Sequence, residues 1–254
     1  MEARLGKYGG IEECARADVF LVRHGYASSR AEAQAAIAAG KVAAEGKKIL
    51  KAAQILHAGM NIAYEPAHPF VSRGGVKLTA ALDAFGLSPE GCVCLDVGSS
   101  TGGFTEVLLM RGAARVYAVD VGREQLHERI KSDPRTISLE GLDARDISPT
   151  IILERPNVIT ADVSFISLKL ALPAALALAA HGAWAVLLVK PQFEVGRTKV
   201  PRTGVVKDEA LRERALDEIA AWVCTCGWNV IGTIKSPILG GDGNREFLLA
   251  ARKD

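Results

Sequence analysis

The order of apolar and polar positions divides the chain into two parts. From about residue 71 onward, short apolar runs alternate with stretches of amphipathic, helical pattern. The apolar runs lie at 92–97, 116–121, 136–140, 158–161 and 184–189, and two more strands are expected at 229–235 and 245–251. Helices are expected over about 73–85, from 104, from 124, over 168–180 and over 207–224. Strands that alternate with helices are typical of an α/β fold with a mainly parallel sheet.

The first part of the chain has a different pattern. Two short helices are expected over 16–25 and 29–40, followed by small strands up to residue 62. Ser29 and Glu32 have the spacing of a capping box, and Gly40 is placed to end the second helix. Residues 64–70 contain two prolines, which is typical of a linker. We therefore expect a small domain over 1–63, a linker over 64–70 and an α/β domain over 71–254.

One apolar stretch, residues 170–189, is long enough to cross a bilayer. Pro173 and the His181-Gly182 pair interrupt it, so a helix followed by a buried strand is the better interpretation. No secretory signal is recognisable at the start of the sequence. We therefore expect no membrane association.

Composition narrows the class of protein further. The chain has 254 residues, of which 49% are hydrophobic and 24% are charged, and this composition argues against disorder. The net charge is +2, but residues 1–63 carry nine Lys or Arg against six Asp or Glu. This basic excess is compatible with a nucleic-acid partner and also with an ordinary solvated surface.

The cysteines indicate a compartment but no metal site. There are five, an odd number, which favours reduced thiols and a cytoplasmic protein. Four of them form two Cys-x-Cys pairs, a closer spacing than zinc ligands usually have. We therefore expect no bound metal.

The segment around residue 98 carries the clearest chemical signal. Asp96 lies near the end of an apolar strand, a glycine turn follows, and Asp120 lies at the end of the next strand. Such a turn lets a ligand approach the backbone, and a carboxylate ending the second strand accepts hydrogen bonds from ribose hydroxyls. The Gly-x-x-x-Gly-Gly spacing and the position of Asp96 favour S-adenosylmethionine over NAD. The alternative is a strand-to-helix bend that sterics alone require.

Further candidates follow the later strands, because ligands of open α/β sheets bind beyond the carboxyl ends of the strands. Asp143 is placed to meet the adenine amino group, or else is a solvated loop charge. Desolvation of Lys190 would favour its neutral, basic form, whereas Asp162 would favour the ammonium; a snorkelling lysine is the alternative. The candidate cofactor-binding residues are Asp96, Gly98, Ser99, Ser100, Gly102, Gly103, Phe104, Asp120 and Asp143.

Residues 16–63 resemble the S4 domain, a compact RNA-binding module of ribosomal proteins and RNA-modifying enzymes. The resemblance rests on segment 29–42, which fits the pattern Ser-Arg-x-x-Ala-x-x-x-Ile-x-x-Gly-x-Val. It implies contacts to RNA phosphates and RNA shape rather than to particular bases. A small helical cap on the larger domain is the alternative. The candidate RNA-binding residues here are Arg16, Arg23, Arg30 and Lys41.

Five segments resemble the TlyA family, whose members join an S4 domain to an FtsJ-like methyltransferase domain and often carry the name haemolysin A. In chain order these segments are 72–78, 96–105, 162–168, 189–196 and 244–247. The resemblance implies a Rossmann-like class I methyltransferase, with a mostly parallel seven-stranded sheet and an antiparallel last strand, beside a small α+β S4 RNA-binding domain. It also implies S-adenosylmethionine-dependent 2′-O-methylation of cytidines in ribosomal RNA, with ribosomal RNA or ribosomal subunits as partners.

The resemblance further implies a catalytic tetrad at Lys77, Asp162, Lys190 and Glu246. A ribose hydroxyl is a poor nucleophile until it loses its proton, so Lys190 is the candidate to accept that proton or to stabilise the alkoxide. Lys77 supplies positive charge nearby, and the two acids orient the two ammonium groups. Which lysine is neutral at that moment stays open.

The loop over 192–206 carries basic residues beside the expected acceptor site. Arg197 and Lys199 are candidates for contacts to RNA phosphates, with a solvated loop of mixed charge as the alternative. Two other functions also stay open. One is a protein that binds RNA or the ribosome with little methylation, and the other is a membrane-active haemolysin, which the interrupted apolar stretch supports poorly.

Overall fold

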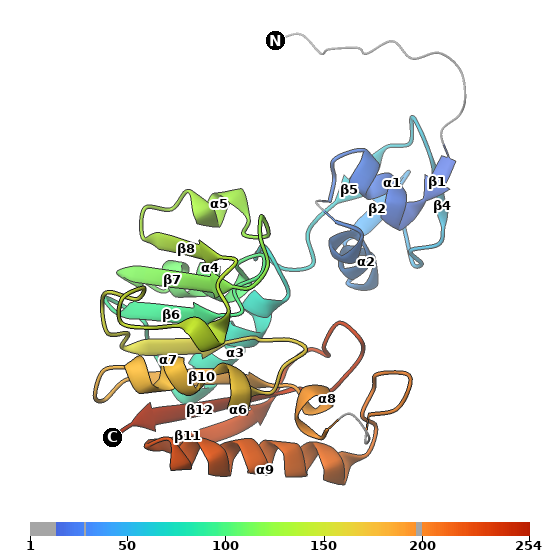
Figure 1. Cartoon of the computed structure of the whole chain (residues 1–254). Coiled ribbons are helices and arrows are strands. Elements are labelled where there is room, and N and C mark those ends of the chain that lie inside the picture. The colour runs from blue at the N-terminus through green and yellow to red at the C-terminus, as the bar shows by residue number, and fades with distance from the viewer. Residues whose placement is uncertain (1–13, 28, 197–199) are drawn as a thin grey trace. The chain divides into compact units, whose positions relative to one another are not determined.

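The computed structural model describes residues 14–27, 29–196 and 200–254, and the chain divides into two compact units over 1–69 and 70–254 (Figure 1). The boundaries expected from the sequence, 1–63, 64–70 and 71–254, remain our proposal for the domain organisation. Each unit has its own hydrophobic core.

The first unit consists of two short helices and two small sheets. Its elements are β1 (Cys14–Arg16), α1 (Ala17–Arg23), α2 (Arg30–Ala38), β2 (Val42–Ala44), β3 (Lys47–Lys48), β4 (Ile55–His57) and β5 (Ile62–Tyr64). Strand β1 pairs with β4, while β3, β2 and β5 form a three-stranded antiparallel sheet in that order. Leu21, Ile37 and Leu56 are buried in the core that joins these elements.

The predicted cap at the start of α2 is confirmed. The backbone N–H of Glu32 donates to Ser29 Oγ at 3.2 Å, so the serine satisfies one of the free donors in the first helical turn. Glu32 Oε1 in turn accepts a hydrogen bond from the Tyr64 hydroxyl at 3.0 Å, which ties α2 to β5. Gly40 follows the helix with φ of +68°, a conformation suited to glycine.

The second unit is built on one seven-stranded sheet. Its strands are β6 (Val93–Val97), β7 (Arg115–Asp120), β8 (Thr136–Glu140), β9 (Val158–Ala161), β10 (Trp184–Val189), β11 (Trp228–Lys235) and β12 (Phe247–Lys253). They are ordered β11-β12-β10-β9-β6-β7-β8. Only the last strand, β12, runs antiparallel to its neighbours; the strands from β10 to β8 pair in parallel. The predicted mostly parallel sheet with an antiparallel last strand is therefore confirmed.

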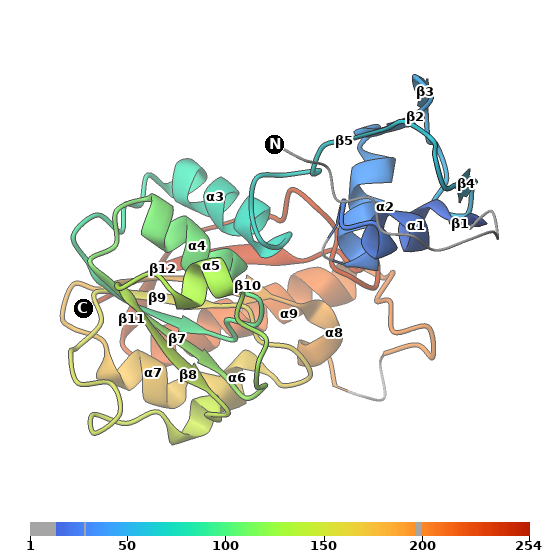
Figure 2. The same ribbon diagram turned by 90° about the horizontal axis from the view of Figure 1, so that it is seen from above.

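Helices cover both faces of this sheet (Figure 2). They are α3 (Gly74–Phe85), α4 (Gly103–Met110), α5 (Glu128–Lys131), the 3-10 turn η1 (Ala144–Asp146), α6 (Leu168–Ala171), α7 (Pro173–Leu178), α8 (Pro191–Glu194) and α9 (Glu209–Thr225). Helices α3, α4 and α5 pack on one face, and α6, α7 and α9 on the other. Successive strand residues point to opposite faces, so Cys94 joins one core and Leu95 the other.

Two expected helices differ from the structure. The helix expected over 168–180 is split into α6 and α7, because Pro173 begins the second helix and cannot donate a backbone bond within the first. The helix expected from Glu124 is only α5, since Glu124 has φ of +56°. The next two backbone N–H groups donate to Glu140 Oε1 instead of forming a helical turn. Among the helices within the described ranges, none is long and apolar enough to span a membrane.

Candidate active site

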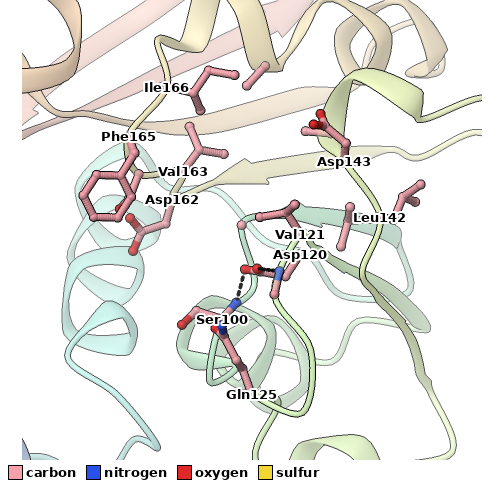
Figure 3. Close-up of a pocket in the computed structure, with 16 residues that line it drawn as sticks. Ser100, Asp120, Val121, Gln125, Leu142, Asp143, Asp162, Val163, Phe165 and Ile166 are labelled. Atoms are coloured by element: carbon pink, nitrogen blue, oxygen red, sulfur yellow. Dashed lines mark hydrogen bonds between the residues drawn. The ribbon is translucent and has the colours of Figure 1, made fainter.

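A cavity of about 460 Å³ opens where β6, β7 and β9 end (Figure 3). Its volume lies in the range of small-molecule and cofactor sites. Gly98 and Ser100 come from the turn after β6, Asp120 and Gly122 from the end of β7, and Asp162 from the end of β9. The cavity therefore lies at the edge of the sheet where the sequence places a ligand.

The Asp120 carboxylate is held in place by the backbone at this edge. Ser100 N–H donates to Asp120 Oδ2 and Gly122 N–H donates to Oδ1, both at 2.7 Å (Figure 3). Each oxygen keeps a free lone pair for a hydroxyl of a ligand. The backbone at position 98 packs closely against the backbone of Asp162. This packing needs glycine, because a Cβ there would lie 2.8 Å from the Asp162 carbonyl oxygen. The turn is thus shaped to bring backbone and carboxylate to one ligand surface.

Asp143, which follows β8, lines the cavity on the side away from Asp162 (Figure 3). Its carboxylate accepts from Arg145 Nη2 at 2.7 Å and Nε at 3.0 Å, and also from the Arg145 backbone N–H. The hydrogen bonds from Arg145 lower the pKa of Asp143 to about 2. The group is therefore ionised at neutral pH and, because each oxygen has two lone pairs, it can still accept from an amino group.

Asp96 is placed differently from the other candidates. It is fully buried, and its carboxylate accepts hydrogen bonds from Thr105 Oγ1 at 2.7 Å and Thr160 Oγ1 at 2.8 Å. Burial raises the pKa of Asp96 to about 6.

Of the candidate cofactor-binding residues, four line the cavity: Gly98, Ser100, Asp120 and Asp143. The other five are not among the residues that line the cavity in the described part of the chain: Asp96, Ser99, Gly102, Gly103 and Phe104.

Lys190 and Asp162 form an ion pair beside the cavity. Lys190 Nζ lies 2.6 Å from Asp162 Oδ1, and the lysine is only 8% exposed. Lys190 Nζ also donates to Ser164 Oγ at 2.7 Å. Asp162 and Ser164 both line the cavity, so the ammonium contacts two residues of its wall.

Lys77 and Glu246 form the second pair. Lys77 Nζ donates to Glu246 Oε2 at 2.6 Å, and both side chains are more than nine-tenths buried. The register relates this pair to the first one, because Val189 at the end of β10 is paired with Phe247 at the start of β12. Lys190 comes directly after Val189, and Glu246 directly before Phe247. Lys190 and Glu246, one member of each pair, therefore lie at the same edge of the sheet.

The structure also shows a residue to which the sequence analysis gave no role. Phe165 is 89% exposed although its backbone has φ of +67°, an unusual conformation for a bulky residue. Its ring lies 5.4 Å from that of Phe193, and it lines the cavity next to Asp162. Phe165 stands three positions after Asp162, and this spacing alone does not reveal its exposure.

In the first unit, two candidate RNA-binding arginines converge on one acid. Asp18 is fully buried and lies 3.1 Å from Arg16 Nε, 2.9 Å from Arg30 Nη2 and 2.7 Å from Gln34 Nε2. Burial opposes the charge of Asp18, but hydrogen bonds from Arg16, Gln34 and Arg30 outweigh burial and hold its pKa well below the usual range. About half of each arginine side chain stays exposed.

The remaining candidate RNA contacts are more scattered. Lys41 Nζ lies 2.7 Å from Glu65 Oε2 on the surface of the first unit, and Arg23 is in the last turn of α1. Arg197 and Lys199 lie outside the described residues. Across residues 14–27, 29–196 and 200–254, no group of three His, Cys, Asp or Glu side chains is arranged to hold a metal ion.

The sheet order, the cavity beyond its carboxyl edge and the small N-terminal unit together define a class I methyltransferase joined to an S4 domain. The family model of FtsJ-like methyltransferases matches residues 70–253, and that of the S4 domain matches residues 15–62. The chain belongs to the TlyA family of FtsJ-like methyltransferases.

Similar proteins support this assignment over nearly the whole length. The 16S/23S rRNA (cytidine-2′-O)-methyltransferase TlyA of Mycobacterium tuberculosis is 45% identical over 94% of this chain and 90% of its own. Hemolysin A of Brachyspira hyodysenteriae is 39% identical, over 92% and 98%. A solved structure of a hemolysin-type protein from Streptococcus thermophilus has a TM-score of 0.76 and 38% identity, over 96% of this chain and 90% of that one.

Proposed function

We propose that this enzyme methylates the 2′-hydroxyl of a cytidine ribose in ribosomal RNA, using S-adenosylmethionine. The observation that carries the proposal is the position of two lysine–carboxylate pairs at one edge of the sheet, the buried Lys77–Glu246 pair and the Lys190–Asp162 pair, whose acid lines the cavity. Two amines and two acids at one place fit the activation of a hydroxyl group better than they fit a purely structural role, because buried charges are costly. The cytidine and the ribosomal RNA come from the name of the relative in Mycobacterium tuberculosis.

The cavity fits the proposed cofactor. The Asp120 carboxylate, oriented by two backbone N–H groups, suits the hydroxyls of an adenosine ribose. Asp143, on the other side, suits the adenine amino group. Gly98 and Gly122 also line the cavity, and a Cβ at either position would meet neighbouring protein atoms. S-adenosylmethionine supplies a methyl group carried by a sulfonium.

The tetrad provides the chemistry for the acceptor. Lys190 accepts the proton of the 2′-hydroxyl, or stabilises the negative charge that develops on the oxygen as the proton leaves. Asp162 forms an ion pair with the Lys190 amine at 2.6 Å, which favours its position beside the cavity. Lys77 adds positive charge, and Glu246 holds it in place and offsets the repulsion between the two amines. The chain thereby orients the acceptor oxygen, and orientation contributes a large part of the rate.

Two surfaces are proposed to hold the RNA. The S4 domain, with Arg16 and Arg30 on its surface, contacts phosphates. The exposed ring of Phe165, at the wall of the cavity, offers a stacking surface for a base turned out of its helix. A substrate of this kind places the enzyme in the cytoplasm, with ribosomal RNA or a ribosomal subunit as its partner.

Methyl transfer to ribosomal subunits tests the proposal. The protein is incubated with methyl-labelled S-adenosylmethionine and with subunits that lack the modification, and label in the RNA is counted. We expect label with the wild type and none with Lys190→Ala, which should still bind subunits. Binding without label by both proteins would instead favour a role in RNA binding alone.

A further inference from the structure

We infer that Ser164 is a positioning residue that sets the direction in which the Lys190 amine faces the acceptor hydroxyl. The inference rests on the proposed function and adds to it a residue outside the tetrad. It starts from one contact, the hydrogen bond from Lys190 Nζ to Ser164 Oγ at 2.7 Å.

The geometry of the amine makes this contact specific. A lysine nitrogen has three positions for hydrogens or a lone pair besides its bond to Cε. Ser164 Oγ occupies one of these positions through a hydrogen bond of 2.7 Å. Asp162 Oδ1 lies 2.6 Å from Nζ as an ion-pair partner but forms no hydrogen bond with it, so it attracts the amine without fixing its rotation. Without the serine hydroxyl, the amine could turn away from the reacting oxygen.

Burial supports the same conclusion. The Lys190 side chain is 9% exposed, and the residues on either side of it, Val189 and Pro191, are buried, so its stem has little room to move. Ser164 is exposed and lines the cavity. The serine hydroxyl therefore holds the amine from the side on which ligands enter, while the protein interior holds the stem.

A purely structural role for Ser164 makes different predictions. The residue precedes Phe165, whose backbone has positive φ, so a change here could also act by moving that ring. Ser164→Ala removes the hydroxyl, whereas Ser164→Thr keeps it and adds a methyl group at an exposed position. Ser148→Ala, which removes an exposed hydroxyl bonded to Thr150, serves as the matched control.

The test measures kcat at saturating ribosomal subunits, its pH dependence, and S-adenosylmethionine binding by calorimetry. For Ser164→Ala we expect kcat to fall about 10- to 100-fold, the value of one hydrogen bond to a charged group. We also expect the pH dependence of kcat to differ from that of the wild type, because the lost hydroxyl contacts the amine that acts on the acceptor proton. Cofactor binding should stay within about twofold, since a neutral contact at the rim contributes little. Ser164→Thr and Ser148→Ala should keep most of the wild-type rate.

Two results would overturn the inference. One is a Ser164→Ala enzyme with the kcat and pH profile of the wild type. The other is a Ser164→Thr enzyme as slow as Ser164→Ala while it binds the cofactor normally, because the hydroxyl is then not the group that matters. A wild-type protein that transfers no methyl group would overturn the proposed function instead.

Discussion

Lys77 Nζ and Glu246 Oε2 lie 2.6 Å apart in the interior, although 169 positions separate the two residues in the chain. Both are more than nine-tenths buried, and a Cβ at Gly240 would lie 2.4 Å from the other oxygen of Glu246. The pair is therefore enclosed by the loop that precedes β12. We expect the pair to contribute both to methyl transfer and to the stability of the fold. Substitutions can separate these two contributions.

Removal of one partner should be costly for stability. Lys77→Met leaves the Glu246 carboxylate buried without a partner, so we expect the free energy of unfolding to fall by about 3–5 kcal/mol and methyl transfer to be lost. The double variant Lys77→Met/Glu246→Leu removes both charges, and most of the stability should return without activity. Urea unfolding and a methyl-transfer assay measure the two quantities. Recovery of activity in the double variant would contradict a catalytic role for the pair.

Asp120 offers a test of the cofactor site. Asp120→Ala removes the acceptors of the Ser100 and Gly122 N–H groups together with the proposed acceptor of ribose hydroxyls. We expect the dissociation constant for S-adenosylmethionine to rise about 10- to 100-fold, as for lost hydrogen bonds to a charged group. Calorimetry measures it. Asp83→Ala, which removes an exposed carboxylate paired with Arg111, is the matched control and should bind like the wild type.

The direction in which Asp18→Asn changes RNA affinity tests whether Asp18 positions Arg16 and Arg30. If net charge alone governed RNA binding, Asp18→Asn would tighten it, because a negative charge is removed from a basic surface. Because Asp18 holds Arg16 and Arg30 by hydrogen bonds, we expect weaker binding instead, by about 3- to 10-fold, since the guanidinium groups lose their orientation.

Fluorescence anisotropy with a ribosomal RNA fragment measures this effect, and circular dichroism checks that the S4 domain stays folded. Glu65→Gln removes a charge from the same unit, at the exposed pair with Lys41, and should bind RNA slightly more tightly. Tighter binding by a folded Asp18→Asn protein would show that the arginines need no positioning.

Asp96 should give the second unit a characteristic pH dependence. Its pKa is about 6 in the folded state, above the ordinary value of 3.8. Between these values the folded state keeps a proton that the unfolded state has lost, so the contribution to stability is full at low pH and is lost as pH rises through about 6. In Asp96→Asn this dependence is absent. We expect the variant to gain about 2–3 kcal/mol relative to the wild type between pH 4 and pH 7, as the shift implies.

Urea unfolding of both proteins at several pH values measures that difference. Thr105 and Thr160 can reorient their hydroxyls to satisfy the new amide, so the variant should fold normally. A difference that does not change with pH would show that Asp96 is ionised like an exposed carboxyl group.

The sequence predicted those elements whose apolar runs end sharply. β8, β9 and β10 have the expected limits, because each run is bounded by polar or turn residues. The expected helix after β7 was wrong over its first turn, because the backbone there bonds to Glu140, a residue on the following strand. Contacts of this kind join residues that are distant in the sequence. The local pattern of apolar and polar positions therefore cannot predict them.

The candidate site shows the same limit. Motifs identified the residues that line the cavity at Gly98, Asp120 and Asp162. They did not identify Ser164 as a partner of Lys190, because that contact joins two loops 26 positions apart. They also did not reveal that two threonine hydroxyls donate hydrogen bonds to the Asp96 carboxylate.

The position of the transferred methyl group tests the central claim most directly. RNA labelled by the wild-type protein is digested with alkali, which cleaves only where a 2′-hydroxyl is free, and the products are separated and analysed by mass spectrometry. The account predicts that the label lies in an alkali-resistant dinucleotide whose 5′ residue is 2′-O-methylcytidine. Label on a cytosine base, or only in mononucleotides, would contradict it.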